Sequence, residues 1–551
     1  PLSTRPWLRW LVIYVAVGVG FGAASVFVPI PVRVQADNCQ ILLAVDRLSQ
    51  GFGPTTIYPK APETDWSFIN HWPVGYPLLL WAVKTAAGTT TITAARVVNV
   101  AAYALALIAW AVWLRRCLPR SRTADLLAVT AAVMAVSATH FWRPSTDMIL
   151  VALTPLILLW VDDLMCRNAV TAGSTCRPRW WSLALLGLAA GGITWLRYTG
   201  LFLTLGLTLY FIACWLRRTG FRFRHLAAFC LGCLVPLVLL AITNATFARS
   251  MIDEPASAFG VRFEWSWFAT WWRHFAQLPL FTSQWRAPHL YACYFPVAVV
   301  LYLVATRGSR RAAADFFRRP AVQLSLCAVA GMFALMMIYR IFAWSFFVTP
   351  AEPRYLMPVR PFYLLAFVGP LLVIPWQRLR QLLWLPLAAC LVWLVQAEWI
   401  DAARTWAAEH HSVTAYGRQA VTFQNDPDGL YTWLRRQNAL DLIIFSNFFD
   451  DIALETHIAA QPLPEDVNEL HDRVVRITRA RNISTPRVLF VLNPDNIWRT
   501  YYLPVHEAIQ TFGLKRAESQ LAAVRRYVFT PYDAGPRPSA FGSSEVPDGI
   551  Q

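Results

Sequence analysis

Long apolar stretches recur along the first 400 residues of the chain. A helix that crosses the hydrocarbon core of a bilayer needs about 20 predominantly apolar residues. We therefore expect a polytopic α-helical membrane protein with about 11 transmembrane helices. The predicted spans are residues 7–30, 91–114, 123–141, 146–163, 180–196, 198–216, 226–247, 288–306, 321–343, 359–376 and 382–399.

Three of the segments between these spans are long, and all three fall on the same side of the predicted membrane: residues 31–90, 248–287 and 344–358. The first contains an amphipathic stretch (Asp37–Gln50), a Gly/Pro turn (Gly51–Pro54) and a short apolar helix (Pro73–Ala87). The loops on the other side are short. Any chemistry is therefore expected on the face that carries the long loops.

Residues 400–551 have a different pattern, in which apolar runs shrink to strand length. Strands are expected at Leu442–Phe445, Val488–Leu492 and Tyr527–Phe529, with helices between them at residues 428–437, 466–479 and 502–512. This alternation predicts a small α/β domain over residues 400–535. Residues 536–551 are rich in Pro, Gly and Ser, which predicts a disordered tail.

Composition and charge support the membrane assignment. Only 15% of the 551 residues are charged and 56% are hydrophobic, whereas a soluble chain carries about 25% charged residues. The net charge of +17 is concentrated in the first 400 residues, because residues 400–551 have a net charge of −3. Basic residues gather in cytoplasmic loops of membrane proteins, so the excess is a topology signal and indicates no nucleic-acid partner.

The arginines fix the predicted orientation. They place the N-terminus in the cytoplasm and the long loops, with the C-terminal domain, on the outer face (N-in/C-out). We expect a multi-pass protein of the bacterial cytoplasmic (inner) membrane, with a periplasmic active site. Twenty arginines lie on the predicted cytoplasmic side: Arg5, Arg9, Arg115, Arg116, Arg120, Arg122, Arg167, Arg177, Arg179, Arg217, Arg218, Arg222, Arg224, Arg307, Arg310, Arg311, Arg318, Arg319, Arg378 and Arg380.

Asp37 is the first candidate for chemistry, since it follows the first span directly on the outer face. A carboxylate near the membrane plane is costly unless it has a partner or a task, and as a general base it would deprotonate a hydroxyl. The alternative is a helix N-cap. Asp46 lies on the same helix beside Arg47 and is interpreted as a solvated charge.

The remaining candidates lie in the outer loops. His71 and Tyr76 open the short apolar helix and carry groups that can donate hydrogen bonds to a substrate, although Pro73 is also a structural helix start. Arg143 and Asp147 lie in the second outer loop, as a structural ion pair or as a site for a phosphate or a metal.

Two Arg–Tyr pairs complete the candidate set: Arg197-Tyr198 in a tight outer turn, and Arg354-Tyr355 in the last outer loop after Glu352. A guanidinium beside a phenol suits a phosphate at the membrane surface, and snorkelling beside an interfacial Tyr is the alternative. Two such pairs on the face that carries Asp37 and Asp147 favour one convergent site.

The order of these motifs resembles the bacterial GT-C superfamily of integral-membrane glycosyltransferases, nearest to the protein O-mannosyltransferase-like group that includes the lipid A aminoarabinose transferase. The resemblance covers roughly residues 1–400. It rests on Asp37 after the first span, the Pro-x-x-Tyr-Pro element at residues 73–77, Asp147, Leu-Arg-Tyr-Thr-Gly at residues 196–200 and Pro-Arg-Tyr-Leu-Met-Pro at residues 353–358.

The resemblance implies a sugar donor linked to a polyprenyl phosphate and transfer on the outer face with inversion. Asp37 and Asp147 are then the catalytic residues, with a divalent cation at Asp147 left open. Arg354, Tyr355, Arg197 and Arg143 contact the donor phosphate, and His71, Tyr76 and Glu352 bind substrate. The acceptor is a glycan, a lipid or a protein.

Asn38 departs from the Asp-Glu pair of many protein-mannosylating relatives, which puts a protein acceptor in doubt. A polytopic lipid or glycolipid transporter (a flippase) is the main alternative. Transporters usually show internal repeats and midplane charges, whereas this sequence shows no repeat and most of its candidate polar residues lie at the outer boundary. A scaffold that only displays the C-terminal domain leaves the outer-loop residues unexplained.

Overall fold

The computed structural model describes two compact units, one made of residues 1–56 and 68–416 and the other of residues 57–67 and 417–551. We call them the helical unit and the α/β unit, and each is described by itself. The described residues are 36–57, 66–69, 72–136, 146–170, 179–217, 221–247, 307–342, 356–373, 377–395, 430–437, 441–464, 466–492, 505–516 and 527–531, with a few between 8 and 20.

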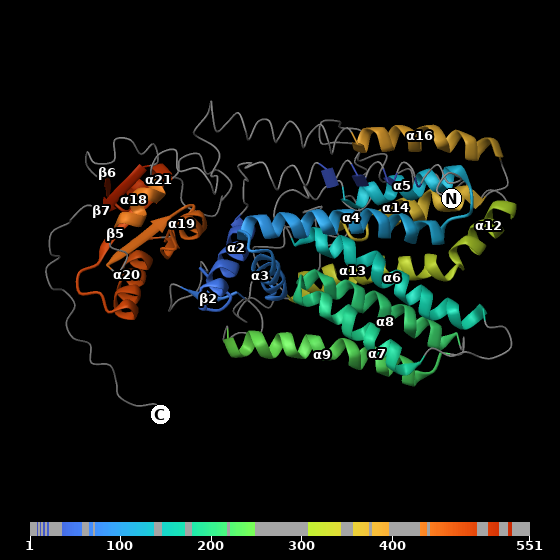
Figure 1. Ribbon diagram of the computed structural model, residues 1–551, viewed down its shortest axis with the longest axis horizontal. Helices are drawn as coiled ribbons and strands as arrows, with labels where there is room; N and C mark the ends of the chain where they lie inside the picture. Colours follow the sequence, from blue (N-terminus) through green and yellow to red (C-terminus); the bar gives the residue numbers. More distant parts are fainter. Residues whose placement is uncertain are drawn as a thin grey trace. The chain divides into compact units, whose positions relative to one another are not determined.

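Long apolar helices form the helical unit (Figure 1). Within the described residues, five are long and apolar enough to cross a membrane, which confirms a polytopic helical membrane protein. They are found in α4 (Thr91–Cys117), α6 (Asp147–Val170), η3 (Tyr198–Gly200) continued by α8 (Leu201–Leu216), α9 (Phe223–Phe247) and α13 (Pro320–Phe342).

Other described helices occupy further predicted spans. They are α5 (Arg122–Val136), α7 (Trp180–Gly192) continued by η2 (Ile193–Trp195), and α16 (Gln377–Val395). The predicted spans 7–30 and 288–306 lie wholly or largely outside the described residues. The count of 11 and the N-in/C-out orientation therefore stay predictions.

The predicted span 359–376 differs from a single helix, because the chain forms α14 (Pro361–Phe367) and α15 (Gly369–Val373). Pro370 has no N–H to donate to the carbonyl of Ala366, so the helix is interrupted there. Gly369 lies so close to the ring of Phe316, in α12 (Arg307–Phe317), that an added Cβ would be 2.6 Å from it. The break thus lets the backbone contact α12.

Glycines bring two helix pairs into backbone contact. A Cβ at Gly187 of α7 would overlap the carbonyl of Phe229 in α9, and a Cβ at Gly232 of α9 would overlap the carbonyl of Ala184 in α7. Gly206 of α8 and Gly331 of α13 meet in the same way. Small residues at helix interfaces allow this close approach in membranes, where hydrophobic burial alone does not drive association.

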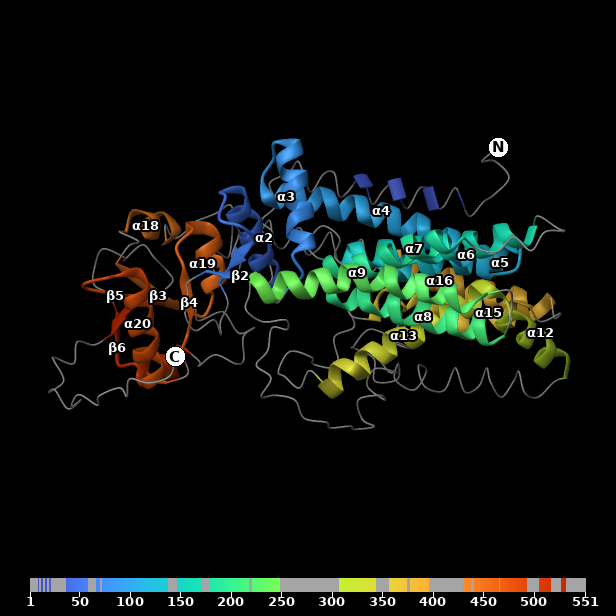
Figure 2. The ribbon, with the colours of Figure 1, turned by 90° about the horizontal axis from the view of Figure 1, so that it is seen from below.

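The first predicted outer loop contains the expected elements, α2 (Ala36–Ser49), a turn and α3 (Gly75–Ala87). It also contains two short strands that the sequence did not predict, β1 (Thr55–Thr56) and β2 (Ser67–Phe68). Gly51 and Gly53 have φ of 84° and 78°, which glycine adopts without strain. Both views place α2 and α3 at the same end of the helical unit, and we call this the α2–α3 end (Figures 1 and 2).

A five-stranded sheet of order β4-β3-β5-β7-β6 forms the α/β unit. β3 pairs in parallel with β4 and β5, and β7 pairs antiparallel with β5 and β6. All five residues of β3 are buried, as expected for a strand covered on both faces. The strands are β3 (Leu442–Ser446), β4 (Ala460–Pro462), β5 (Arg487–Leu492), β6 (Leu514–Arg516) and β7 (Tyr527–Pro531).

One described helix precedes β3, and three lie between strands: α18 (Leu430–Arg436) comes first, followed by α19 (Phe449–Thr456), α20 (Val467–Arg481) and α21 (Val505–Thr511). Leu470, Val474 and Ile477 of α20 pack on a core that includes Phe445 and Phe490 of the sheet. The three predicted strands and three predicted helices are confirmed. The domain limits at residues 400 and 535 and the disordered tail stay predictions.

Candidate functional site

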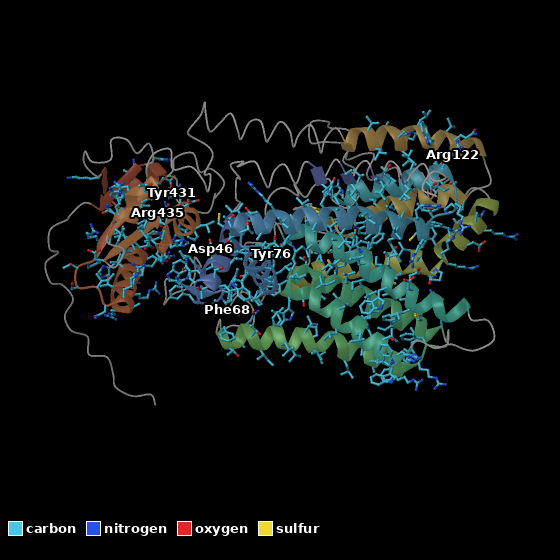
Figure 3. All side chains as sticks on the ribbon, viewed as in Figure 1. Asp46, Phe68, Tyr76, Arg122, Tyr431 and Arg435 are labelled. Carbon is cyan, nitrogen blue, oxygen red and sulfur yellow. The ribbon has the colours of Figure 1, made fainter. Side chains whose placement is uncertain are left out.

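Buried polar residues gather at the α2–α3 end of the helical unit. Phe68 stacks on Phe247 at the last turn of α9 with ring centroids 5.4 Å apart, so α9 ends here. Gly75, at the start of α3, lies against the backbone of Trp195 in η2. Figure 3 shows Asp46, Phe68 and Tyr76 close together at this end. Several segments distant in sequence therefore converge here.

A buried ion pair joins two of the predicted site residues, Asp147 and Arg197. Nη2 of Arg197 lies 2.8 Å from Oδ1 of Asp147, and the two residues are 3% and 8% exposed. Asp147 is the first residue of α6, and Arg197 directly precedes η3, so the pair joins two helix starts. Because charges in an apolar surrounding are stable only when paired, neither residue can be removed alone without a large penalty.

Further contacts fix the guanidinium of Arg197 in place. Its Nε donates to the hydroxyl of Thr199 at 3.2 Å, and its Nη1 donates to the hydroxyl of Thr146. The ring of Trp72 lies 5.5 Å from its Cζ, within the range of a cation–π contact. These contacts come from the loop before α3, the start of α6 and η3. Arg197 therefore connects these three segments at the α2–α3 end.

A second set of buried polar residues lies on α4. Arg96, Asn99 and Tyr103 are spaced three and four residues apart, so they share one helix face, and all three are buried. The hydroxyl of Tyr76 donates to Oδ1 of Asn99 at 3.3 Å. Tyr76, a predicted substrate-binding residue, is itself buried and joins α3 to α4 through this bond.

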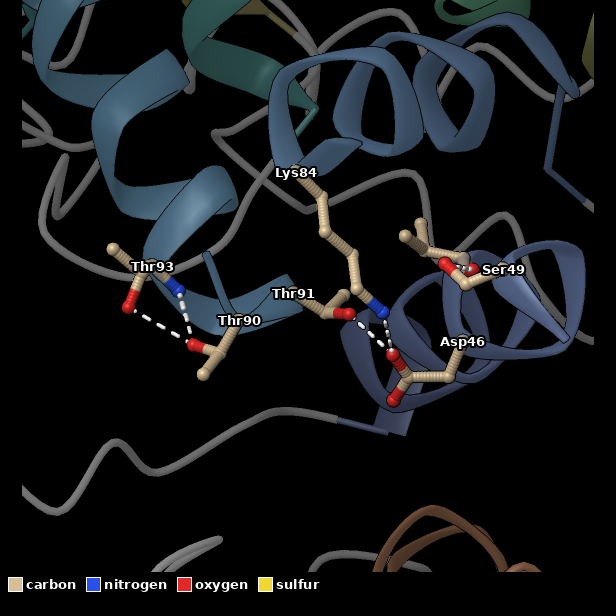
Figure 4. Close-up of polar contacts among 7 residues, drawn as sticks. Asp46, Ser49, Lys84, Thr90, Thr91 and Thr93 are labelled. Carbon is tan, nitrogen blue, oxygen red and sulfur yellow. Dashed lines mark hydrogen bonds and ion pairs between the residues drawn. The ribbon is translucent and has the colours of Figure 1, made fainter. Parts of the chain in front are cut away.

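Asp46 joins three elements of the first loop. Its Oδ1 lies 2.8 Å from Nζ of Lys84 in α3 and accepts a hydrogen bond from the hydroxyl of Thr91, the first residue of α4 (Figure 4). Its side chain is 23% exposed. The interpretation of Asp46 as a solvated charge beside Arg47 was therefore wrong, because its partners lie 38 and 45 residues away and no local pattern indicates them.

Tyr198 and Asn244 form a further link, between η3 and α9. Nδ2 of Asn244 donates to the hydroxyl of Tyr198 at 3.0 Å. Asn244 is 3% exposed and Tyr198 is half-buried. This hydrogen bond lies one residue along the chain from Arg197, and so it belongs to the same end of the molecule.

Some predicted site residues cannot be placed in this arrangement. Asp37 lies in the first turn of α2, and only its backbone is described. His71, Arg143, Glu352, Arg354 and Tyr355 lie outside the described residues. Their roles stay predictions. The described part of the chain contains no group of three His, Cys, Asp or Glu residues that could hold a metal ion, and the metal at Asp147 also stays a prediction.

Sequence reasoning missed Arg96, Asn99 and Asn244. A signal was present, because each is a charged or amide residue within a predicted span. Polar residues inside a membrane helix usually face the interior of the bundle and mark a functional or structural contact. A search for long apolar runs does not detect a single polar residue inside a span.

The described helices form a polytopic helical membrane protein, and their arrangement resembles the GT-C fold of solved structures. The structure is similar to ArnT from Cupriavidus metallidurans bound to undecaprenyl phosphate, with a TM-score of 0.53 and 14% sequence identity, covering 96% of this chain and 99% of that one. For ArnT in the apo state the TM-score is 0.54 and the identity 15%, with the same coverage. The expected GT-C fold is confirmed.

An oligosaccharyltransferase from Archaeoglobus fulgidus, in complex with Zn and sulfate, gives a TM-score of 0.45 at 13% identity over 94% of this chain and 73% of that one. The shared fold therefore rests on the ArnT structures. No protein-family model matches the chain, and no curated protein matches it in sequence.

Proposed function

We propose that this protein transfers a sugar from a polyprenyl-phosphate-linked donor to an acceptor hydroxyl on the outer face of the bacterial cytoplasmic membrane. One observation carries the proposal. The fold matches, over 96% of the chain, that of ArnT from Cupriavidus metallidurans bound to undecaprenyl phosphate. The convergence of buried polar residues at the α2–α3 end supports it, because such residues are expensive in a membrane bundle unless they serve a site.

In the proposed reaction Asp37 is the general base. Its carboxylate takes the proton of the acceptor hydroxyl, whose oxygen forms the new bond to the anomeric carbon of the sugar. The bond from that carbon to the phosphate oxygen breaks on the opposite side, and the polyprenyl phosphate leaves with the electron pair. The configuration at the anomeric carbon is therefore inverted.

The arginines stabilise the leaving group in this proposal. Negative charge grows on the phosphate as the glycosidic bond breaks, and donors fixed near it lower the barrier. Arg354, Tyr355 and Arg143 are assigned this role by their motifs. Arg197 adds positive charge at the same end, while its described contacts with Asp147, Thr146 and Thr199 also position Asp147. His71 and Glu352 are assigned to the substrate.

The test is donor consumption by the purified full-length protein. Undecaprenyl phosphate-linked sugars, both hexoses and pentoses, are incubated with the protein and a bacterial envelope extract as the source of acceptor. We expect release of undecaprenyl phosphate from at least one donor. Asp37→Asn is expected to lower the rate by about 10²- to 10⁴-fold, the usual contribution of a general base, without changing the melting temperature or donor binding.

Three results separate the assignment of the base, the function and the transporter alternative. Unchanged turnover in Asp37→Asn disproves the assignment of the base but leaves a glycosyltransferase. No consumption of any donor by the unaltered protein, under conditions in which it is folded, contradicts the function. If the protein instead moves the lipid-linked sugar across a vesicle membrane without cleaving it, the transporter alternative is correct.

A further inference from the structure

Asn244 is an amide buried in an apolar helix, and only one of its two polar atoms makes a hydrogen bond. Its Nδ2 donates to the hydroxyl of Tyr198 at 3.0 Å. Its Oδ1 is buried and has no hydrogen-bond partner among the described residues. An unsatisfied polar atom in such a place costs about 1–3 kcal/mol, so buried polar groups are nearly always paired. An orphan atom at a candidate site is therefore a point at which a ligand group can bind.

The chemistry of that ligand group follows from the amide. The oxygen and nitrogen of an Asn side chain are placed by their surroundings and can be exchanged by a flip about χ2. In one orientation the orphan atom is an acceptor, and in the other it is a donor. A hydroxyl group can both donate and accept, so it satisfies Asn244 in either orientation. A phosphate oxygen, which only accepts, fits one of the two orientations alone, and a polyprenyl chain offers no hydrogen bond.

The position of the pair favours a hydroxyl of the donor sugar. Tyr198 is half-buried, so its contact with Asn244 lies where the bundle interior meets the surface. The preceding residue is Arg197, whose buried ion pair with Asp147 belongs to the same end of the bundle. In a sugar phosphate the ring hydroxyls lie within a few bonds of the phosphate. A donor whose phosphate binds at this end would present its hydroxyls to the neighbouring residues.

We infer that Asn244, held by Tyr198, binds a hydroxyl group of the sugar on the lipid-linked donor. This inference rests on the proposed function and extends it, since it names a residue that distinguishes the sugar-loaded lipid from the bare lipid phosphate. A transferase benefits from binding the sugar-loaded lipid more tightly than the bare lipid phosphate. The lipid phosphate must leave after transfer, and a contact made only by the sugar is lost when the sugar is transferred.

The experiment compares two ligands on the full-length protein. Undecaprenyl phosphate and undecaprenyl phosphate carrying the sugar that gives turnover are titrated against the unaltered protein, Asn244→Ala, Tyr198→Phe and Thr243→Ala. Thr243 is the matched control, because it precedes Asn244 on the same helix and its hydroxyl donates to Leu239 of its own helix at 2.8 Å. Melting temperatures are measured for all four proteins.

We expect Asn244→Ala to weaken binding of the sugar-loaded lipid about tenfold, the equivalent of one hydrogen bond, while binding of the bare lipid phosphate changes by less than about twofold. Tyr198→Phe should give a smaller loss with the same selectivity, and Thr243→Ala neither. Equal weakening of both ligands in Asn244→Ala and Tyr198→Phe would show that the pair is only structural. No weakening of either ligand would equally overturn the inference.

The proposed function fails in a different way. If the unaltered protein neither binds nor consumes any undecaprenyl phosphate-linked sugar, the function is wrong and the inference falls with it. If Asn244→Ala does not fold, Tyr198→Phe, which keeps the ring and removes only the hydroxyl, decides between the outcomes above.

Discussion

Charged residues are paired in different surroundings at the α2–α3 end of the helical unit and in the α/β unit. In the helical unit, charged residues at the α2–α3 end are buried, and Arg197 and Asp147 pair across helices. In the α/β unit the core is apolar, and charge pairs such as Arg487–Asp441 lie at the surface, with side chains 49% and 32% exposed. The pair at the α2–α3 end is therefore shielded from water, whereas the pair in the α/β unit is in contact with water.

The physical reason is the surrounding medium. Water stabilises an unpaired surface charge, so a surface pair adds about 0–1 kcal/mol. Removing one partner of a buried pair leaves a charge without compensation, at a penalty of about 3–5 kcal/mol. The comparison therefore predicts where substitutions will matter most, and the following four variants test it.

The largest effect is expected at a backbone contact in the helical unit. Gly232→Ala places a Cβ where the carbonyl of Ala184 lies, so α7 and α9 must separate. We expect little folded protein in detergent, as judged by size-exclusion chromatography. Gly192→Ala is the control, because nothing lies within 4 Å of its added Cβ, and it should behave like the unaltered protein. Equal yields of the two variants would contradict the role of the contact.

The buried ion pair should come next. Arg197→Ala leaves the carboxylate of Asp147 buried without its partner and is expected to destabilise the protein by about 3–5 kcal/mol. This loss of stability is measured by thermal unfolding in detergent. The double variant Arg197→Met/Asp147→Leu removes both charges and should regain most of the stability while losing sugar transfer. A double variant that is less stable than the single one would refute the ion-pair explanation.

A smaller effect is expected at Asp46, whose side chain is partly exposed. Lys84→Met removes one of its two partners but leaves the hydroxyl of Thr91. We expect a loss of about 1 kcal/mol in stability, together with faster proteolysis of the first loop, since α2 and α3 lose a cross-link. Lys84→Arg, which keeps the charge, is the control. A larger loss than that of Arg197→Ala would reverse the order predicted from burial.

The smallest effect is expected in the α/β unit. Arg487→Ala removes an exposed ion pair with Asp441 and should change stability by less than about 1 kcal/mol, with normal sugar transfer. Thermal unfolding in detergent and sugar transfer are measured for this variant as for the others. If it proves as harmful as Arg197→Ala, the contrast between the two units is wrong.

Much of the fold could be predicted from the sequence, because it depends on local patterns. The Gly/Pro turn at residues 51–54, α3 and the strands β3, β5 and β7 follow from spacing and turn residues a few positions apart. The strands β4 and β6 were missed, since three residues carry too little periodicity to be read. The break at Gly369-Pro370 was visible as a Pro in an apolar run but was counted as part of one span.

The candidate site was predicted only in part. Asp147 and Arg197 were identified separately by residue type and loop position, and the structure joins them into one pair. Their pairing depends on how α6, α7 and η3 pack, which no pattern within a single helix records. The partners of Asp46 and the bond between Asn244 and Tyr198 were missed for the same reason, since each spans about 40 residues of sequence.

The glycine contact between α7 and α9 has a consequence for Asn244 and Tyr198. α7 leads through η2 to Tyr198, and α9 ends just after Asn244, so the spacing of these two side chains is set where Gly187 and Gly232 touch the opposite backbone. Helices in backbone contact have little freedom to slide or rotate. A ligand entering between the two side chains then meets a preorganised pair of groups, and less conformational entropy is lost on binding.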